Sequence, residues 1–453
     1  MDIIIVGCGK VGESLAAELG TEGNNVTVVD ENPTKVKYVA TKYDIMGVIG
    51  NGATRQVQME AGVDTADLLI AVTGSDELNL LCCLMAKKSG GCQTIARIKN
   101  PDYAKDAPHL RDELGLAMVI NPEYAAAEEI TRILRFPSAI KVETFSKGRV
   151  ELLKFRLPEN SPLVGLSLKD AMIKLKSNVL VCTVEREDEV YIPKGDFVFA
   201  ERDIISIIAS AKSTSEFLDK IAIKAQSVKT VTIIGGGDMT HYLCELLDKA
   251  GISIKIIEKN ADICNELANK FDNAIVICGD PADEDVLREE RVGGSDAFIA
   301  LTSLDEENIL LSLFAKNEGS KKVITRINRI EYNGVISKLD LDSIIYPKNL
   351  TADMIIRFVR AKQNTAGSNL ETLYNLIRGE VEVAEFTVNE SSPIVGKPLS
   401  ELRFKNDALI AAIIRGKQLI VPRGGAVIEP GDSVVTVTKL LYLRDVSDLL
   451  SEQ

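Results

Sequence analysis

Residues 1–30 read MDIIIVGCGKVGESLAAELGTEGNNVTVVD. The apolar, β-branched run at 3–6 predicts a buried strand that breaks into a glycine-rich turn and then an amphipathic helix. A second predicted strand at 26–29 ends in Asp30. Strand, G-x-G-x-x-G turn, helix, strand and terminal acid form, in this order, the fingerprint of a dinucleotide-binding domain.

The three glycines of the turn have separate physical tasks. Gly7 permits the tight turn, Gly9 lets a pyrophosphate approach the backbone, and Gly12 lets the helix lie close to the strand. The helix N-terminus then faces the phosphate. Because Asp30 accepts hydrogen bonds from the ribose hydroxyls and would repel a 2′-phosphate, NAD(H) or an adenine nucleotide is favoured over the phosphorylated dinucleotide.

Further along the chain, strands alternate with helices, which predicts a parallel, doubly wound sheet. Thr73 and Gly74 end the fourth strand and Arg97 ends the next one, at the edge where ligands bind in such sheets. The guanidinium of Arg97 can stack on adenine or pair with a phosphate. An ion pair of Arg97 with Asp76 or Glu77 is the alternative.

The same pattern returns in the second half of the chain. A predicted strand at 231–234 leads into a glycine-rich turn, and Thr240 stands where the third glycine is expected. We expect the Cβ atom of Thr240 to push the helix away from the strand and to alter or weaken the second site. Residues Gly7, Gly9, Asp30, Thr73 and Arg97 correspond in order to Gly235, Gly237, Glu258, Thr302 and Arg326.

Each nucleotide domain is followed by a small α+β module, and the modules share the motif S-P-[LI]-V-G at 161–165 and 392–396. Between them lie predicted helices near 123–136 and 349–362. These helices pack either on their parent domain or, crossing over, on a second nucleotide domain. The expected fold class is α/β, with two Rossmann-like doubly wound parallel sheets, each followed by a small α+β domain. The expected units are 1–122, 123–141, 142–225, 226–348, 349–379 and 380–453.

The composition excludes several function classes. A net charge of −13 over 453 residues argues against a nucleic-acid partner, which requires a basic stripe, and against docking on anionic lipid. No apolar stretch reaches the roughly 18–20 residues that span a bilayer, and no signal peptide is recognised. The eight cysteines contain no C-x-x-C pair, so reduced thiols in a cytoplasm are expected.

A catalytic constellation is missing from the sequence. His109 and His241 are expected at the surface or in caps, and Tyr38 and Lys42, although spaced like a dehydrogenase pair, follow the second strand too closely to reach a nicotinamide ring. There is no metal-ligand cluster, nucleophile elbow or GK[ST] loop, so we expect no catalytic residue and no metal site. An NAD-dependent dehydrogenase and a soluble nucleotide or redox sensor remain as alternative functions.

The order of these motifs resembles RCK (KTN) domains, which regulate potassium conductance. The resemblance rests on the glycine-rich turn, Asp30, the loop 50–54, the segment 71–79 (AVTGSDELN) and the segment 96–101 (ARIKNP). The duplicated arrangement, in which each copy is followed by an RCK-C module, resembles the TrkA family. Members of that family are cytosolic NAD-binding subunits of Trk-type potassium uptake systems, and the resemblance covers essentially the whole chain.

The resemblance implies regulation by a nucleotide without chemistry. In such families paired RCK domains form a ring beneath a membrane potassium transporter or channel, and NAD(H) or ATP/ADP changes its shape and gating. We expect a membrane potassium-uptake subunit as partner, a dimer or tetramer of this chain, and a peripheral position on the inner face of the membrane. In the first copy the implied ligand contacts, with Gly12 of the glycine-rich turn included, are Gly7, Cys8, Gly9, Lys10, Val11, Gly12, Asp30, Thr73, Gly74 and Arg97. In the second copy they are Gly235, Gly236, Gly237, Asp238, Met239, Glu258, Thr302 and Arg326.

Overall fold

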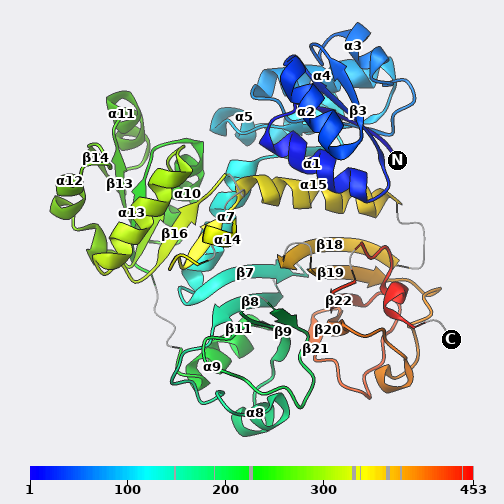
Figure 1. Cartoon of the computed structure of the whole chain (residues 1–453), viewed down its shortest axis with the longest axis vertical. Helices are drawn as coiled ribbons and strands as arrows, with labels where there is room; N and C mark the ends of the chain where they lie inside the picture. The colour runs from blue at the N-terminus through cyan, green and yellow to red at the C-terminus, as the bar shows by residue number, and fades with distance from the viewer. Residues whose placement is uncertain are drawn as a thin grey trace.

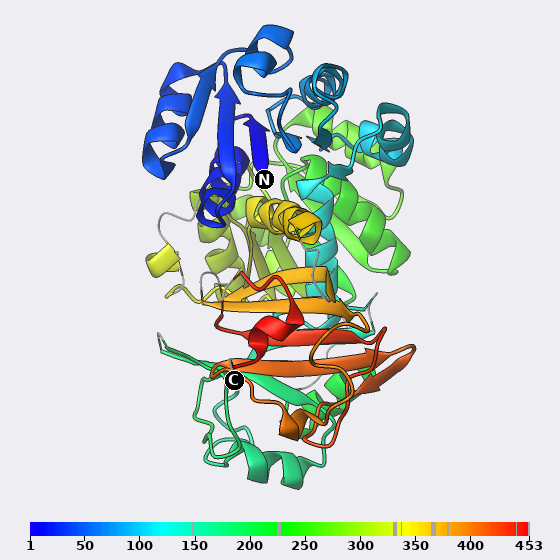
Figure 2. The same ribbon diagram turned by 90° about the vertical axis from the view of Figure 1, so that its right-hand side faces the viewer.

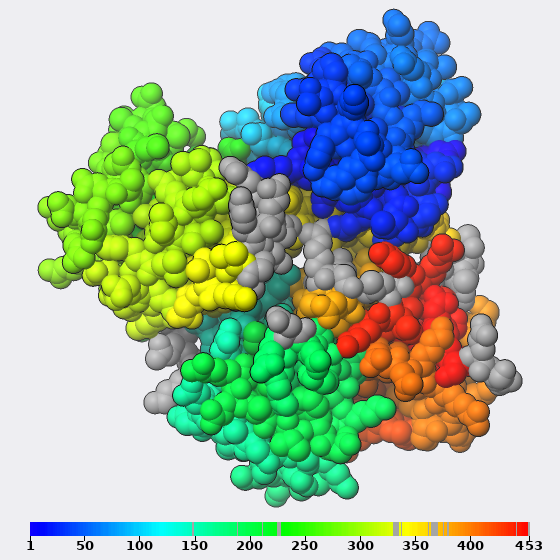
Figure 3. All heavy atoms as spheres, in the orientation of Figure 1, coloured from blue at the N-terminus to red at the C-terminus, as the bar shows by residue number. Residues whose placement is uncertain are grey.

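The computed structural model describes all residues except 147–148, 188, 224–227, 329–332, 337, 364–367, 378–379, 441 and 452–453. In the described part of the chain the strands form two six-stranded and two five-stranded sheets (Figure 1). The six-stranded sheets belong to the nucleotide domains, and the five-stranded sheets lie together at the opposite end of the molecule (Figure 2). The space-filling view shows the first nucleotide domain, in blue, and the second, in green to yellow, as separate lobes (Figure 3).

The first nucleotide domain is a parallel sheet with the strand order β3-β2-β1-β4-β5-β6. Order 3-2-1-4-5-6 is that of the doubly wound dinucleotide-binding fold, so the predicted fold class is confirmed. Its strands are β1 (Asp2–Val6), β2 (Asn25–Asp30), β3 (Met46–Ile49), β4 (Leu68–Ala71), β5 (Gln93–Arg97) and β6 (Met118–Ile120). Its helices are α1 (Lys10–Thr21), α2 (Pro33–Tyr43), α3 (Arg55–Glu60), α4 (Asp76–Ser89), α5 (Pro101–Lys105) and α6 (Ala107–Leu114).

The second nucleotide domain repeats this topology, with the strand order β14-β13-β12-β15-β16-β17. Its strands are β12 (Thr230–Ile234), β13 (Ser253–Glu258), β14 (Ala274–Cys278), β15 (Ala297–Ala300), β16 (Val323–Arg326) and β17 (Ser343–Ile345). Its helices are α10 (Asp238–Lys249), α11 (Ala261–Lys270), α12 (Glu284–Glu289), the 3₁₀ turn η1 (Val292–Gly294), α13 (Asp305–Asn317) and α14 (Asn333–Ile336). The duplication seen in the sequence is thus a duplication of the sheet.

The two small modules are antiparallel sheets, β10-β9-β11-β8-β7 and β18-β19-β22-β20-β21. One apolar core, which includes Phe145, Leu152, Val383 and Val435, joins a face of each, so the modules pack on one another. The first contains β7 (Ala139–Phe145), β8 (Val150–Arg156), α8 (Leu168–Leu175), β9 (Leu180–Arg186), β10 (Glu189–Tyr191), β11 (Ile204–Ala209) and α9 (Ala211–Lys220). The second contains β18 (Ser368–Ile377), β19 (Val381–Val388), η2 (Leu399–Glu401), β20 (Ala408–Arg415), β21 (Gln418–Ile420), β22 (Ser433–Thr438) and η3 (Val446–Leu449).

Two long helices, α7 (Pro122–Arg135) and α15 (Pro347–Gln363), connect these layers. The side chain of Asn121 accepts the hydrogen bond of the Tyr124 amide, and proline opens α7, as helix N-termini favour. The buried face of α7, with Ile130, packs in the core of the second nucleotide domain. The buried face of α15, with Ile355, packs in the core of the first (Figure 1).

The helices therefore cross over, which is one of the two packings that the sequence left open. Leu15 and Leu19 of α1 share a core with α15, whereas Leu243 of α10 shares one with α7. The helices α7 and α15 also contact each other. Among the described helices, none has both the length and the apolar composition needed to span a bilayer.

Candidate nucleotide-binding site

A cavity of about 550 Å³ opens at the carboxyl ends of the strands of the first sheet. This is the edge where ligands bind in doubly wound folds. Its walls come from both nucleotide domains, since Arg326, Asn328, Pro347 and Lys348 face the glycine-rich turn of the first domain. The remaining lining residues are Val6, Gly7, Gly9, Lys10, Val11, Val29, Asp30, Glu31, Lys35, Gly50, Gly52, Val72, Thr73, Gly74, Ser75, Leu78, Arg97, Pro122 and Glu123.

The glycines of the first turn show the predicted geometry. Gly7 has a φ of +110°, and a Cβ atom there would lie 3.0 Å from the backbone of Val72 and Thr73. A Cβ atom on Gly12 would lie 1.8 Å from the carbonyl oxygen of Gly7, so a side chain here would collide with the glycine-rich turn. A Cβ atom on Gly9 would meet nothing within 4 Å. Gly9 lines the cavity, and the open space beside it gives a ligand access to the backbone.

Asp30 holds the glycine-rich turn as well as facing the cavity. Its carboxylate accepts hydrogen bonds from the backbone amides of Cys8, at 2.7 Å, and Asn32, at 2.9 Å. Cys8 is buried, and burial together with the charge of Asp30 raises the pKa of its thiol to about 12. The thiol therefore stays neutral and inert at neutral pH, which speaks against a redox sensor based on Cys8.

Asn79, which the sequence reasoning did not single out as a site residue, fixes the relative position of the two strand ends. Its buried side-chain oxygen accepts from the backbone amide and the hydroxyl of Thr73, both at 2.8 Å. Its amide nitrogen donates to the carbonyl of Arg97 at 2.9 Å. In the second domain Asn308 likewise accepts from the Thr302 amide and donates to the Arg326 carbonyl. These bonds explain why the segment 71–79 and its repeat share an asparagine.

Arg97 and Arg326 both line the cavity. In each, the Nε atom is buried and has no hydrogen-bond partner in the described structure. The expected alternative for Arg97, an ion pair with Asp76 or Glu77, is not formed: Asp76 instead accepts from the backbone amides of Lys99 and Asn100. Burial lowers the pKa of Arg326, partly offset by nearby carboxylates. Two arginines that line one cavity favour an anionic group there.

The charge of the cavity differs from that of the chain. Five basic and three acidic side chains line it, although the whole chain has a net charge of −13. Glu123 is one of the acids, and one of its buried oxygens has no partner in the described structure. The basic groups are Lys10, Lys35, Arg97, Arg326 and Lys348. A phosphate-bearing ligand fits this excess of positive charge.

The second glycine-rich turn keeps the backbone of the first. Gly237, the residue before α10, has φ −73° and ψ −177°, and Gly9, the residue before α1, has φ −75° and ψ −174°. The hydroxyl of Thr240, at the position of the third glycine, donates a 2.6 Å hydrogen bond to the Gly235 carbonyl. Its backbone amide also bonds to Gly237 at 2.9 Å, which tightens the first helical turn.

The chemistry around the second turn is nevertheless different. Asp238 replaces Lys10 at the first helical position and lies 3.9 Å from the ammonium group of Lys99. An acid at a helix N-terminus repels the phosphate that a lysine there attracts. Met239 is buried, unlike Val11. Of the second-copy candidates, only Arg326 lines the first cavity; those outside its lining are Gly235, Gly236, Gly237, Asp238, Met239, Glu258 and Thr302.

The structure corrects one expectation about the histidines. His109 is exposed, but His241 is buried, with its Nε2 atom 3.1 Å from Glu266. His241 lies in the first turn of α10, and its ring packs against that of Phe271, with 5.9 Å between the centroids. Tyr38 and Lys42 do touch, at 2.8 Å, but neither lines the cavity. In the described residues no group of three or more His, Cys, Asp or Glu side chains could hold a metal ion.

The fold and the cavity define a class: proteins with two Rossmann domains joined by crossed connecting helices. Over 97% of its length the chain is similar in structure to the GsuK RCK domain, with a TM-score of 0.64, 17% identity and 92% of that chain covered. At this identity the likeness concerns the fold alone.

The sequence identifies the family within this class. Residues 3–122 and 231–347 match the TrkA-N domain, and residues 152–222 and 383–450 match the TrkA-C domain. The chain is 35% identical over 443 residues to the Trk system potassium uptake protein TrkA homolog 1 of Methanosarcina mazei, with 96% of each chain covered. It is 31% identical to Trk system potassium uptake protein TrkA of Halomonas elongata, with 99% of this chain and 98% of that one covered. The chain belongs to the TrkA family.

Proposed function

We propose that this chain is a regulatory subunit of a Trk-type potassium uptake system and binds a nucleotide in the cavity of its first Rossmann domain. The observation that carries the proposal is the cavity itself, in which a glycine-rich turn, Asp30, Arg97 and Arg326 line the same space. Membership of the TrkA family, whose relatives are named for potassium uptake, supports the transport role.

The residues of the cavity divide between the parts of a nucleotide. Gly9 and the N-terminus of α1 would receive a pyrophosphate, and Asp30 would accept from the ribose hydroxyls. Arg97 and Arg326 would pair with phosphate or stack on adenine. NAD(H), ADP and ATP share these features, and GsuK, which has the same fold, has been solved with NAD and with ADP.

Regulation follows from the position of the cavity between two domains. A ligand that contacts both the glycine-rich turn and Arg326 stabilises the arrangement in which the two domains approach. Its effect equals the difference between its affinities for the two arrangements, so no chemical step is required. The chain would act from the cytoplasmic face on a membrane potassium-uptake subunit, as a dimer or tetramer of identical chains.

The test combines binding with transport. Calorimetry on the full chain should show binding of NADH, ATP or ADP, and the chain should co-purify with a membrane potassium-uptake protein. In vesicles that contain both proteins, a saturating nucleotide should change the potassium flux. If NADH, NAD and ATP all leave the flux unchanged, the proposal fails. Oxidation of NADH in the presence of carbonyl compounds would favour the dehydrogenase alternative, and a pull-down without a membrane protein would favour the soluble sensor.

A further inference from the structure

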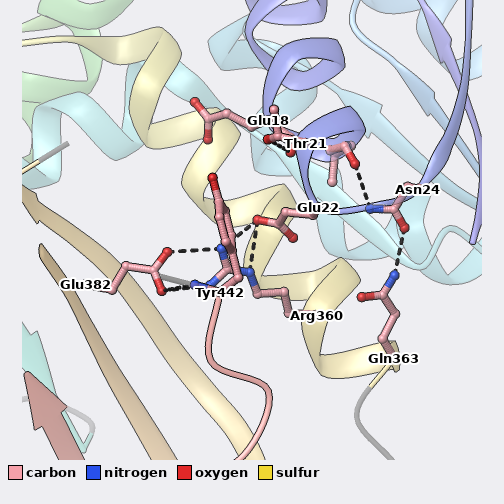
Figure 4. Close-up of polar contacts among 9 residues, drawn as sticks. Glu18, Thr21, Glu22, Asn24, Arg360, Gln363, Glu382 and Tyr442 are labelled. Carbon is pink, nitrogen blue, oxygen red and sulfur yellow. Dashed lines mark hydrogen bonds and ion pairs between the residues drawn. The ribbon is translucent and has the colours of Figure 1, made fainter. Parts of the chain in front are cut away.

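Three charged side chains meet where the first nucleotide domain, α15 and the second C-terminal module come together. Arg360, on the last turn of α15, donates from Nε and Nη2 to Glu22 at 3.0 and 2.5 Å. It donates from Nη1 and Nη2 to Glu382 on β19, both at 3.1 Å. Figure 4 shows the guanidinium between the two carboxylates. Only 3–6% of each of these side chains is exposed.

Neighbouring contacts strengthen this junction. The Tyr442 backbone amide donates to Glu382 at 3.0 Å, and its ring lies 5.2 Å from the Arg360 guanidinium carbon. Gln363 donates to Asn24 at 2.7 Å, a second link from α15 to the end of α1 (Figure 4). Burial opposes the charge of Arg360, but hydrogen bonds to Glu22 and the charge of Glu382 raise its pKa above the ordinary value. The guanidinium is therefore a permanent cation here.

The junction lies at the far end of the helix that forms the nucleotide site. The N-terminus of α1, at Lys10, lines the cavity, and Glu22 follows its last residue. A helix of 12 residues is about 18 Å long, so α1 spans the distance from the cavity to the junction. Glu22 stands at the negative end of the helix dipole, where a carboxylate is unfavourable unless a cation such as Arg360 compensates it.

We propose that Glu22, Arg360 and Glu382 form a latch through which nucleotide occupancy of the first cavity is transmitted to the second C-terminal module. This inference rests on the proposed nucleotide site. One guanidinium serves two carboxylates that belong to different domains. If α1 shifts relative to the module, Arg360 can keep only one of them, and the other loses its partner in a buried place. Such a loss is costly, so the latch favours two discrete arrangements over a gradual change.

The other half of the chain lacks this latch, although it has the same topology. The counterparts of Arg360 and Glu382 are Arg135 and Glu151, which lie 3.4 Å apart, with 57% of the Arg135 side chain exposed. Ala250, which follows α10, stands in the place of Glu22 and is exposed. The second domain therefore has no carboxylate at this point, and the latch serves the domain that contains the cavity.

The experiment compares the full chain with Glu22→Gln and with the matched control Arg135→Met, using NADH and ATP as separate probes. Hydrogen exchange is followed in Val381–Val388 with and without nucleotide, and affinities are measured by calorimetry. In the wild type and in Arg135→Met, nucleotide should change the exchange of this strand. In Glu22→Gln the change in exchange should shrink at least about fivefold, and the nucleotide affinity should also shift at least about fivefold, the lower end of typical coupling.

The outcomes distinguish the latch from the site itself. If Glu22→Gln binds nucleotide and shows the same change in exchange as the wild type, the latch is wrong. If the wild type binds neither NADH nor ATP, the proposed function fails, and the latch with it. Should Glu22→Gln fold poorly, Arg360→Lys replaces it, because lysine keeps the charge but cannot serve two carboxylates with a planar fork. Wild-type coupling in that variant would also overturn the latch.

Discussion

At the scale of single residues, Gly9 and Gly12 are needed for opposite reasons. A side chain on Gly9 would extend into the open space of the cavity, whereas one on Gly12 would meet the Gly7 carbonyl. The backbone of Gly9, at φ −75°, is accessible to any residue. Substitution therefore separates the binding role of this turn from its folding role.

We predict that Gly9→Ala folds normally and loses nucleotide affinity by tenfold or more, because its methyl group occupies the approach of the phosphate. Gly12→Ala should lose about 1–3 kcal/mol of folding stability through overpacking. Calorimetry and urea unfolding measure the two effects. Gly237→Ala is the matched control for binding, and equal affinity in Gly9→Ala and the wild type would contradict the prediction.

Asp30 gives a second prediction at this scale. Asp30→Ala should weaken nucleotide binding about 10- to 150-fold, since hydrogen bonds to a charged group contribute about 1.5–3 kcal/mol. The domain should remain folded, as circular dichroism would show. Glu258→Ala removes the corresponding acid of the second turn, which lies outside the cavity, and should change the affinity of the first site less than twofold. If Asp30→Ala binds nucleotide as tightly as Glu258→Ala and the wild type do, the ligand has been placed in the wrong domain.

At the scale of elements, the crossed helices determine which parts of the chain depend on each other. Ile130 on α7 is fully buried in the core of the second nucleotide domain, and Ile355 on α15 is fully buried in the core of the first. The core of each nucleotide domain is thus completed by the helix that follows the other nucleotide domain in the sequence.

We predict that Ile130→Ala lowers stability by about 2–5 kcal/mol, the usual effect of an apolar cavity. The loss of hydrogen-exchange protection should appear in β12 and α10 of the second domain and spare β1. Ile355→Ala is the reciprocal control and should affect β1 and α1 instead. Loss of protection in the parent domain of each helix would contradict the crossed packing.

At the scale of the whole molecule, the cavity is a joint product of both nucleotide domains. We predict that Arg326→Gln weakens nucleotide binding at the first site about tenfold or more, because a charge-assisted contact is lost from across the interface. Arg288→Gln, an exposed arginine paired with Glu284 in the same domain, is the control and should bind normally. Calorimetry of both variants decides whether the second domain contributes to the site.

The molecule also has a titratable centre where α7, α15 and both C-terminal sheets meet. Burial, followed by the charge of Glu129, raises the pKa of Glu143 to about 7. The charged and titratable groups around it are Glu129, Arg132, Lys141, Asp353, Arg357 and Tyr374. In the unfolded chain a glutamate loses its proton near pH 4.3. Between pH 4.3 and 7, Glu143 is therefore protonated in the folded state and ionised in the unfolded state.

Stability should therefore fall as the pH rises from about 4.3 to 7, by about 3–4 kcal/mol, and this contribution is absent above pH 7. Glu143→Gln cannot ionise, so its stability should not show this fall. Its stability relative to the wild type should therefore increase as the pH rises. Thermal unfolding of both chains between pH 5 and pH 8 measures it. Parallel curves for the two chains would show that Glu143 keeps an ordinary pKa in the fold.

Much of the fold could be predicted because its signals are local. The run 3–6, the glycine spacing and Asp30 determine a strand, a turn and a second strand within thirty residues, and their repetition at 231–258 shows the duplication. Backbone sterics, apolar periodicity and helix capping act between near neighbours, so the sequence alone determined two doubly wound domains and two small modules.

Only the tertiary structure decided how these parts serve one another. The apolar stripe of α7 indicates that one face of the helix is buried. It does not indicate which domain covers that face. For the same reason Arg326, predicted as a residue of the second site, lines the first cavity, and Glu22 and Arg360 meet although 338 positions separate them. Such pairings depend on the surfaces that pack together, and no local pattern in a chain specifies its distant partner.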